Sequence, residues 1–296
     1  MGRMVKSIFL SGIVFLCVGG TALAADLWQD LKKAVEQGNQ KKPEPGKSPS
    51  GPLGGIDLGV VRSLAGFSQE EEVAIGRQAA GNILGAAPLV KDTKLQQYVN
   101  RVGRWVADQS ERPDLVWHFG VIESNDINAF AAPGGYIFVT KGLYKALQNE
   151  SELAGVFAHE IGHVIRKHHL KLLQQGQLMD LGSKLLVKKT GENQYIKNLI
   201  GNGAEIFARS LDKNAEFEAD RIAVVLAARS GYDPFGLPVV LQDIGHVAKN
   251  DDRIKLLFKT HPLPDDRLAE LGEAVGDRLD GIKGLTLEKR FYKLKP

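Results

Sequence analysis

The sequence has little cysteine, little net charge and no long hydrophobic run beyond its first residues. Its only cysteine, Cys17, lies in the N-terminal segment, so the rest of the chain can form no internal disulfide. Beyond residue 24 no stretch approaches the unbroken run of about 18 apolar residues that a membrane-spanning helix needs. The formal net charge is only +3 at pH 7, so neither a nucleic-acid partner nor a strongly acidic substrate is indicated.

The N-terminus has the pattern of a secretory signal peptide. Arg3 and Lys6 precede an apolar run over residues 8–18, and Ala22 and Ala24 then match a small-x-small cleavage site. We therefore expect residues 1–24 to be removed on export. An uncleaved membrane anchor is the alternative, although the run is short for a spanning helix of about 20 residues.

Composition divides the remaining chain into three parts. Residues 25–56 contain a short amphipathic helix and a flexible linker rich in Pro, Gly, Ser and Lys. The helix could contact a membrane peripherally or pack on its own domain, and its sequence leaves both open. We expect one compact domain over residues 57–280 and a basic C-terminal tail over 281–296.

Periodicity and capping signals within this domain predict an α+β fold that is mainly helical, with one small sheet. Ser68 with Glu71 and Asn149 with Glu152 form capping boxes, so a helix should begin after each. Strands are predicted over 116–122 and 136–140, the latter after a turn at 133–135. Further helices are predicted over 93–109, 174–188, 194–210, 213–230, 236–248 and 264–275.

The most informative motif is His159-Glu160-Ile161-Gly162-His163, an H-E-x-x-H string inside an apolar helical segment. Two histidines four residues apart lie about 40° apart around a helix axis, so both imidazoles can reach one metal ion. Glu160 lies on the same helix, where it can take a proton from the attacking water. This pattern predicts the core of a zinc metallopeptidase with His159 and His163 as metal ligands and Glu160 as general base.

One candidate for the third metal ligand is His169, whose spacing is that of the metzincin motif. Metzincins have a glycine three residues after the second histidine, and this sequence has Arg166 there. Arg166 lets the helix continue, which places His169 about 120° around from His163 and about 9 Å further along the axis. We therefore expect His168 and His169 to be partly exposed helix residues.

A better candidate lies in the predicted helix 213–230. Glu216 shares its helix face with Asp220 and with small apolar residues. Glu218 shares its face with Arg221, and an ordinary solvent-exposed ion pair between these two residues would explain why an acid occurs there. Buried acids need a partner, and a metal with its histidines supplies one. Glu216 is thus the expected third ligand. Asp220, one turn later, is expected to accept a hydrogen bond from a ligand histidine.

Four motifs together resemble the HtpX and CAAX-prenyl-protease-like family of zinc metallopeptidases, and most of all its soluble periplasmic branch, the BepA and LoiP type. They are residues 128–140, 149–163, 216–220 and 261–267. The resemblance implies a gluzincin domain that binds one Zn²⁺ per chain, with Glu216 as third ligand. It also implies a periplasmic location.

The resemblance also suggests how substrate binds. It places the 128–140 segment as an edge strand of the sheet bordering the metal cleft, where an extended polypeptide can add as a neighbouring strand. The expected contact residues are Asn128, Ala129, Phe130, Gly134 and Gly135. A buried core strand with a tight turn is the alternative interpretation.

His261 and Arg267 form the last motif, and their roles stay open. Both are hydrogen-bond donors suited to stabilising the oxyanion of a tetrahedral intermediate, and in some relatives the histidine caps the metal and shuts the site. Arg267 could instead pair with Asp266 or Glu270.

The function expected from these observations is zinc-dependent endopeptidase activity on unfolded or misassembled cell-envelope proteins. The alternative is a latched protease that acts mainly as a chaperone-like factor in envelope or outer-membrane protein assembly. The expected partners are polypeptide substrates, and the sequence does not indicate an oligomeric state.

Overall fold

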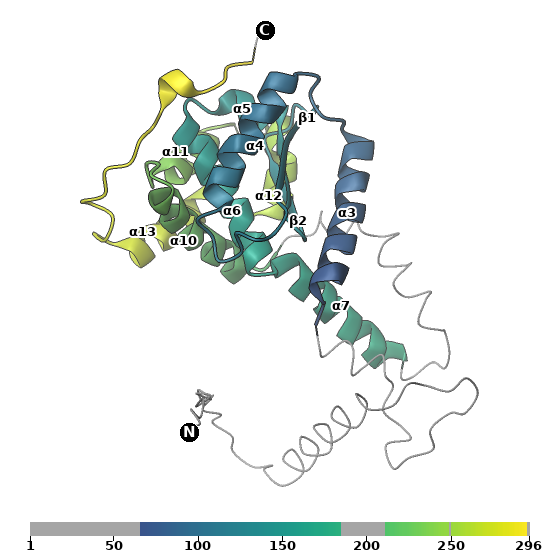
Figure 1. Cartoon of the computed structure of the whole chain (residues 1–296). Helices are drawn as coiled ribbons and strands as arrows, with labels where there is room; N and C mark the ends of the chain where they lie inside the picture. The colour runs from purple at the N-terminus through teal and green to yellow at the C-terminus, as the bar shows by residue number, and fades with distance from the viewer. Residues whose placement is uncertain (1–65, 185–210, 249, 295–296) are drawn as a thin grey trace, which may run out of the picture. The chain divides into compact units, whose positions relative to one another are not determined.

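The computed structural model describes residues 66–184, 211–248 and 250–294 of the 296-residue chain (Figure 1). Contacts divide the chain into one unit of residues Met1–Gly55 and another of Ile56–Pro296, and the described part belongs to the second. The predicted signal peptide, the short helix and the linker after it, and the predicted helix 194–210 lie outside the described residues.

Helices and three short strands follow one another along the described part of the chain. The elements before the H-E-x-x-H motif are α3 Gln69–Ala86, α4 Thr93–Ala107, β1 His118–Ile122, β2 Ala129–Ala132, β3 Tyr136–Thr140 and α5 Lys141–Ala146. From the motif onward they are α6 Glu150–Ile165, α7 His168–Lys184, α10 Lys213–Arg229, α11 Gly236–Gly245, η1 Asp252–Ile254, α12 Lys255–Thr260, α13 Pro264–Val275 and η2 Glu288–Arg290.

The structure confirms the predicted α+β class, with helices predominating around one small sheet. The predictions for α4, α10 and α13 match at their first residues, where capping groups or a proline mark the start. The helix predicted over 174–188 begins earlier, at His168. Sequence periodicity missed α5 and α12, which have six residues each, because so short a helix completes fewer than two turns.

The predicted strand 136–140 and the turn at 133–135 are confirmed as β3 and the turn before it. The expectation that 128–140 forms one edge strand is wrong, because a separate strand, β2, precedes the turn. The sheet order is β1-β3-β2, with β1 parallel and β2 antiparallel to the central strand β3. Gly134 and Gly135 both have positive φ, which lets the chain reverse between β2 and β3. The edge strand is therefore β2, and β3 lies inside the sheet.

The sheet separates two hydrophobic layers. Ile137 and Val139 of β3 belong to the main core together with residues of α4 and α6, whereas Tyr136 and Phe138 pack against α3. Figure 1 shows α3 and α4 on opposite sides of the strands. This arrangement places β2 against α6, the helix that carries the H-E-x-x-H motif.

The start of α6 is held by the C-terminal segment, part of the expected basic tail. The buried Glu150 carboxylate accepts hydrogen bonds from the hydroxyls of Tyr98 at 2.8 Å and Tyr232 at 2.7 Å, and from Arg290. Phe291 beside Arg290 is buried in the main core. Residues around 290 thus pack with the rest of the domain and fix the first turn of α6.

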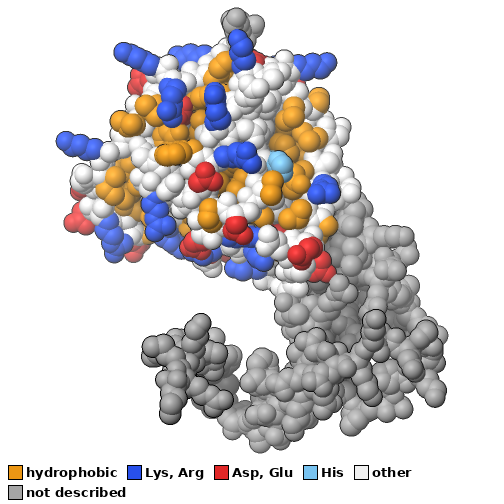
Figure 2. Space-filling model, in the orientation of Figure 1, with side chains coloured by type: hydrophobic (Ala, Val, Ile, Leu, Met, Phe, Trp, Pro, Cys, Tyr) orange, Lys and Arg blue, Asp and Glu red, His pale blue; other side chains and the backbone are white. Residues whose placement is uncertain are grey.

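The surface of this unit carries mixed charge. On the face drawn in Figure 2, basic and acidic side chains are interspersed, and hydrophobic side chains form small groups between them. Among the described helices, none has both the length and the apolar character needed to cross a bilayer.

Candidate metal centre

Helix α6 directs His159 and His163 toward one point. Their Nε2 atoms lie 3.0 Å apart, and the two residues are 3 % and 1 % exposed. The helix is buried from Glu150 to Val164, as expected for a helix that is apolar on nearly all sides. Its first turn is capped by Asn149, whose side chain accepts the backbone N–H of Glu152 at 3.1 Å. The two imidazoles are therefore held on a rigid, dry element.

Glu216 of α10 joins the two histidines. Its Oε2 lies 3.7 Å from Nε2 of His159 and its Oε1 lies 3.6 Å from Nε2 of His163. The side chain is fully buried, and its Oε1 has no hydrogen-bond donor among the described residues. Burying a carboxylate oxygen without a hydrogen-bond donor costs free energy of desolvation, and a bound cation would compensate that cost. Two imidazoles and this carboxylate fit a catalytic zinc ion, because His₂Glu is an established ligand set.

The close approach of α6 and α10 depends on small residues. A Cβ atom placed on Gly162 would lie 3.2 Å from Cα of Ala219, so even one added carbon would make this contact tight. Ala219 and Ala223 are both buried on the same face as Glu216 and Asp220. Periodicity predicted this face correctly, and its small residues bring Glu216 within reach of the histidines.

His261 supplies a fourth donor beside this set. It directly follows α12, and its Nδ1 lies 2.6 Å from Oε2 of Glu216. Burial by itself would lower the pKa of His261, but the Glu216 carboxylate outweighs burial and raises it. One donor atom from each of His159, His163, Glu216 and His261 lies within 4.8 Å of the others. The described residues thus bring all three predicted ligands and His261 into one cluster.

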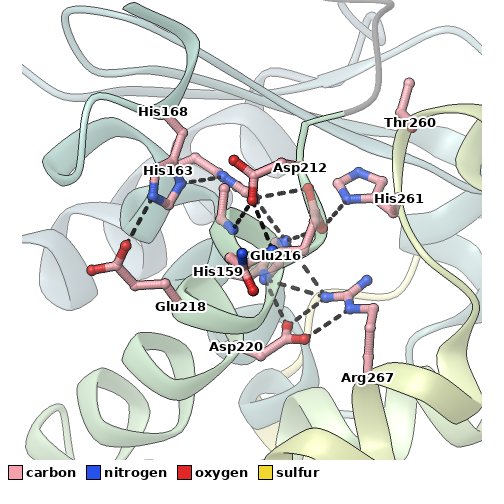
Figure 3. Close-up of polar contacts among 12 residues, drawn as sticks. His159, His163, His168, Asp212, Glu216, Glu218, Asp220, Thr260, His261 and Arg267 are labelled. Carbon is pink, nitrogen blue, oxygen red and sulfur yellow. Dashed lines mark hydrogen bonds and ion pairs between the residues drawn. The ribbon is translucent and has the colours of Figure 1, made fainter. Parts of the chain in front are cut away.

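Asp220 and Arg267 lie behind His159 (Figure 3). The Asp220 Oδ1 atom is 2.9 Å from Nδ1 of His159, the contact expected of an acid that orients a ligand histidine. Arg267 binds the same carboxylate through Nε at 2.9 Å and Nη2 at 2.5 Å. Burial alone would raise the pKa of Asp220, but Arg267 outweighs it and holds that pKa well below its usual range. The buried partner of Arg267 is therefore Asp220, not Asp266 or Glu270.

Glu160 borders a small cavity beside the four donors. The cavity has a volume of about 20 Å³, which holds about one water molecule. Its walls include Glu160, His163, Glu216 and His261, and residues 129–131 of the edge strand β2. Burial raises the pKa of the Glu160 carboxyl, which brings it closer to the value suited to a general base near neutral pH.

The residues expected to bind substrate separate into two groups. Ala129 and Phe130 line the cavity, whereas Asn128, Gly134 and Gly135 are not among its lining residues. Asn128 is fully buried and its backbone pairs with Thr140 of β3. The Gly134 N–H donates to the buried Glu72 of α3 at 3.3 Å. These three residues lie in the sheet and its turn, outside the cavity wall, and their contact with substrate stays a prediction.

The prediction that the motif helix continues through Arg166 is wrong. Helix α6 ends at Ile165, Lys167 adopts a left-handed φ of 55°, and α7 begins at His168. The chain therefore changes direction, and His168 is buried against His163 instead of being partly exposed, whereas His169 is partly exposed as predicted. His169 lines the cavity but lies outside the cluster of four donors in the described part of the chain.

The prediction of a solvated Glu218–Arg221 pair also needs correction. Glu218 instead binds Nε of Arg166 at 3.0 Å and Nε2 of His168 at 3.2 Å. Sequence reasoning missed the contribution of His168 because neither glycine nor proline marks the turn after α6. The available signal was a pair of histidines directly after the motif helix.

Comparison with known proteins gives consistent matches to metallopeptidases. Residues 93–275 match peptidase family M48. The chain is 33 % identical over 215 residues to the beta-barrel assembly-enhancing protease of Yersinia pestis, covering 70 % of this chain and 44 % of that protein. It is 33 % identical over 210 residues to the protein of that name in Escherichia coli strain K12, covering 68 % and 43 %. It is 26 % identical over 223 residues to mitochondrial metalloendopeptidase OMA1 of Arabidopsis thaliana, covering 75 % and 43 %. The chain thus spans less than half the length of these relatives.

Proposed function

This chain belongs to peptidase family M48, and on that premise we propose that it is a zinc-dependent endopeptidase that cleaves unfolded or misassembled cell-envelope proteins. One observation carries the proposal. The buried Glu216 carboxylate meets the Nε2 atoms of His159 and His163 with one oxygen lacking a hydrogen-bond donor, beside a cavity that also contacts Glu160. That is the arrangement of a metal site next to a general base.

The residues of the site divide the chemistry between them. His159, His163 and Glu216 would hold Zn²⁺, which when bound polarises the scissile carbonyl and acidifies the attacking water. Glu160 takes the proton from that water and passes it to the leaving amine. Asp220 fixes the Nδ1 side of His159, and Arg267 holds Asp220 in place. This contact supports a positioning role for Arg267 rather than a direct one at the oxyanion.

The edge strand β2 supports a polypeptide substrate. Among the described residues β2 pairs with only one strand, β3, and its residues 129–131 line the cavity beside Glu160. An extended polypeptide can therefore add along this edge through main-chain hydrogen bonds. Two of the relatives are named for beta-barrel assembly, and the sequence predicts a signal peptide that would export the chain. From these names and this prediction we infer substrates among envelope proteins in the periplasm.

The proposed activity predicts internal cleavage of an unfolded protein. The mature, zinc-loaded chain should cut casein into peptides that retain no common terminus, because an open strand edge does not require a free chain end. Mass spectrometry of the fragments checks this expectation, with a chelator-treated sample as control. Cleavage restricted to chain ends, or cleavage that survives removal of the metal, would contradict the proposal.

His261 favours a site that is shut at rest. His261 lines the cavity beside Glu160, and its Nδ1 atom lies 2.6 Å from Oε2 of Glu216, so its side chain stands next to the proposed metal position. A latched protease that opens on substrate or a partner is therefore the second candidate, with a chaperone-like role while it is closed. In the same position His261 could also act on the oxyanion, so its replacement distinguishes the two roles.

We expect His261→Ala to raise the rate of casein cleavage. If the open state is about 10 % populated, removing the latch can raise the rate by up to about tenfold. The kcat and KM of the variant are measured against His246→Ala, which removes an exposed histidine at the end of α11. A fall in kcat with unchanged KM would instead assign His261 to the oxyanion.

A further inference from the structure

The two ligand histidines are supported differently on the side away from the metal. Nδ1 of His159 faces the carboxylate of Asp220 directly. Nδ1 of His163 faces another imidazole, the Nδ1 atom of His168, at 2.9 Å. Both residues of this second contact are buried, so water does not readily replace it.

The contact continues from His168 toward the surface. Nε2 of His168 lies 3.2 Å from Oε2 of Glu218, and the other oxygen of Glu218 forms an ion pair with Arg166, whose Nε lies 3.0 Å away. Figure 3 shows His168 between His163 and Glu218. Arg166 is held in turn by both carboxylate oxygens of Glu111, at 2.8 and 3.1 Å.

Only one placement of protons on the two imidazoles satisfies this chain of contacts. A metal on Nε2 of His163 requires a lone pair there, so the proton of this neutral ring is on Nδ1 and is donated to Nδ1 of His168. His168 must then carry its own proton on Nε2, which it donates to the Glu218 carboxylate. The carboxylate, which can only accept, therefore determines the tautomer of both rings.

We propose that His168 and Glu218 are positioning residues that fix the tautomer and orientation of His163 for metal binding. The inference rests on the metal site proposed above. Helix α10 then supports both ligand histidines in addition to supplying Glu216. Its Asp220 contacts His159 directly, and its Glu218 supports His163 through His168. The turn at Lys167 makes this possible because it returns His168 to the end of α6.

The chain of contacts from Glu218 through His168 to His163, called the relay below, predicts that its members affect zinc affinity to different extents. We expect His168→Ala to weaken Zn²⁺ binding by about 10- to 100-fold, the range for groups that orient a metal ligand. Glu218→Ala should weaken Zn²⁺ binding by about tenfold, the lower end of this range. The Glu218 side chain is 38 % exposed, so water can partly replace its carboxylate. Glu218→Gln should weaken binding less than Glu218→Ala, since the amide oxygen still accepts from His168.

Competition with a chromogenic chelator, using Zn²⁺ and the full mature chain, measures these affinities. Arg221→Ala is the matched control, because Arg221 is exposed on the same helix one turn from Glu218. We expect it to change affinity by less than about twofold. Circular dichroism checks the fold of each variant. If His168→Ala does not fold, the Glu218 variants decide the question by themselves.

A second measurement separates positioning from mere packing. In zinc-loaded protein labelled with ¹⁵N-histidine, the Nδ1 proton of His163 should give a low-field resonance that His168→Ala removes or shifts. Affinities equal to that of Arg221→Ala together with an unchanged resonance would overturn the relay and leave the proposed peptidase standing. Failure of the wild-type chain to bind Zn²⁺ would instead contradict the proposed function itself.

Discussion

Glu160→Gln should abolish peptide cleavage while the protein still binds zinc. The amide has nearly the shape of the carboxylate but cannot take a proton from the attacking water. We expect a loss of about 10²- to 10⁴-fold in kcat, the usual contribution of a general base. Glu160 is not one of the four clustered donors in the described residues, so its replacement should leave zinc affinity near that of the wild type.

Casein turnover and chelator competition, measured on the same preparation, check both parts of this expectation. Glu270→Gln, an exposed glutamate on α13, controls for the loss of one negative charge. Full activity of Glu160→Gln would contradict the mechanism, whereas loss of zinc from this variant would make Glu160 a ligand instead of a base. The same inactive variant can retain bound substrate, so comparison of the envelope proteins it captures with those captured by the wild type identifies candidate substrates.

Glu216→Ala should remove zinc from the protein. The variant loses one of three proposed ligands, so we expect an affinity loss above about 100-fold, greater than for groups that only orient a ligand. Zinc should raise the melting temperature of the wild-type chain but not that of the variant, because only a bound metal stabilises the folded state. Metal analysis after dialysis and thermal unfolding with and without Zn²⁺ measure the two effects.

Glu218→Ala is the informative comparison, because Glu218 lies two residues away on the same helix. Glu218 is proposed to act on the metal site only through His168. We therefore expect Glu218→Ala to lower zinc affinity by about tenfold, clearly less than Glu216→Ala. Intact zinc affinity in Glu216→Ala would contradict the ligand assignment and favour a metzincin-like site that uses His169. In that case His169→Ala should lose zinc instead.

Much of the fold follows from local signals. Capping residues mark the starts of α3, α4, α6 and α10, and proline marks that of α13. These signals are interactions within one or two helical turns, which is why they can be read along the chain. Local signals also predicted the turn at 133–135 and the strand after it. They could not show which strand lies at the edge, because strand order depends on pairing with the distant strand β1.

The site shows the same division between local and distant determinants. Helical spacing was enough to predict that His159 and His163 face one point and that Glu216, not Glu218, lies on the buried face of its helix. The role of Glu218 was missed because it depends on where α6 ends. Lys167 has a left-handed φ of 55°, which neither a glycine nor an asparagine at this position announces in the sequence.

The sequence by itself determined the residue types and the helical spacing that bring together the two imidazoles of His159 and His163, the proposed base Glu160 and the buried carboxylate of Glu216. Only the tertiary structure decided which groups surround them. It placed His261 on Glu216, Arg267 on Asp220 and His168 between His163 and Glu218. The physical reason is separation along the chain. Groups within one helix are related by a fixed geometry, whereas groups on different helices meet only where small residues such as Gly162 and Ala219 let those helices pack closely.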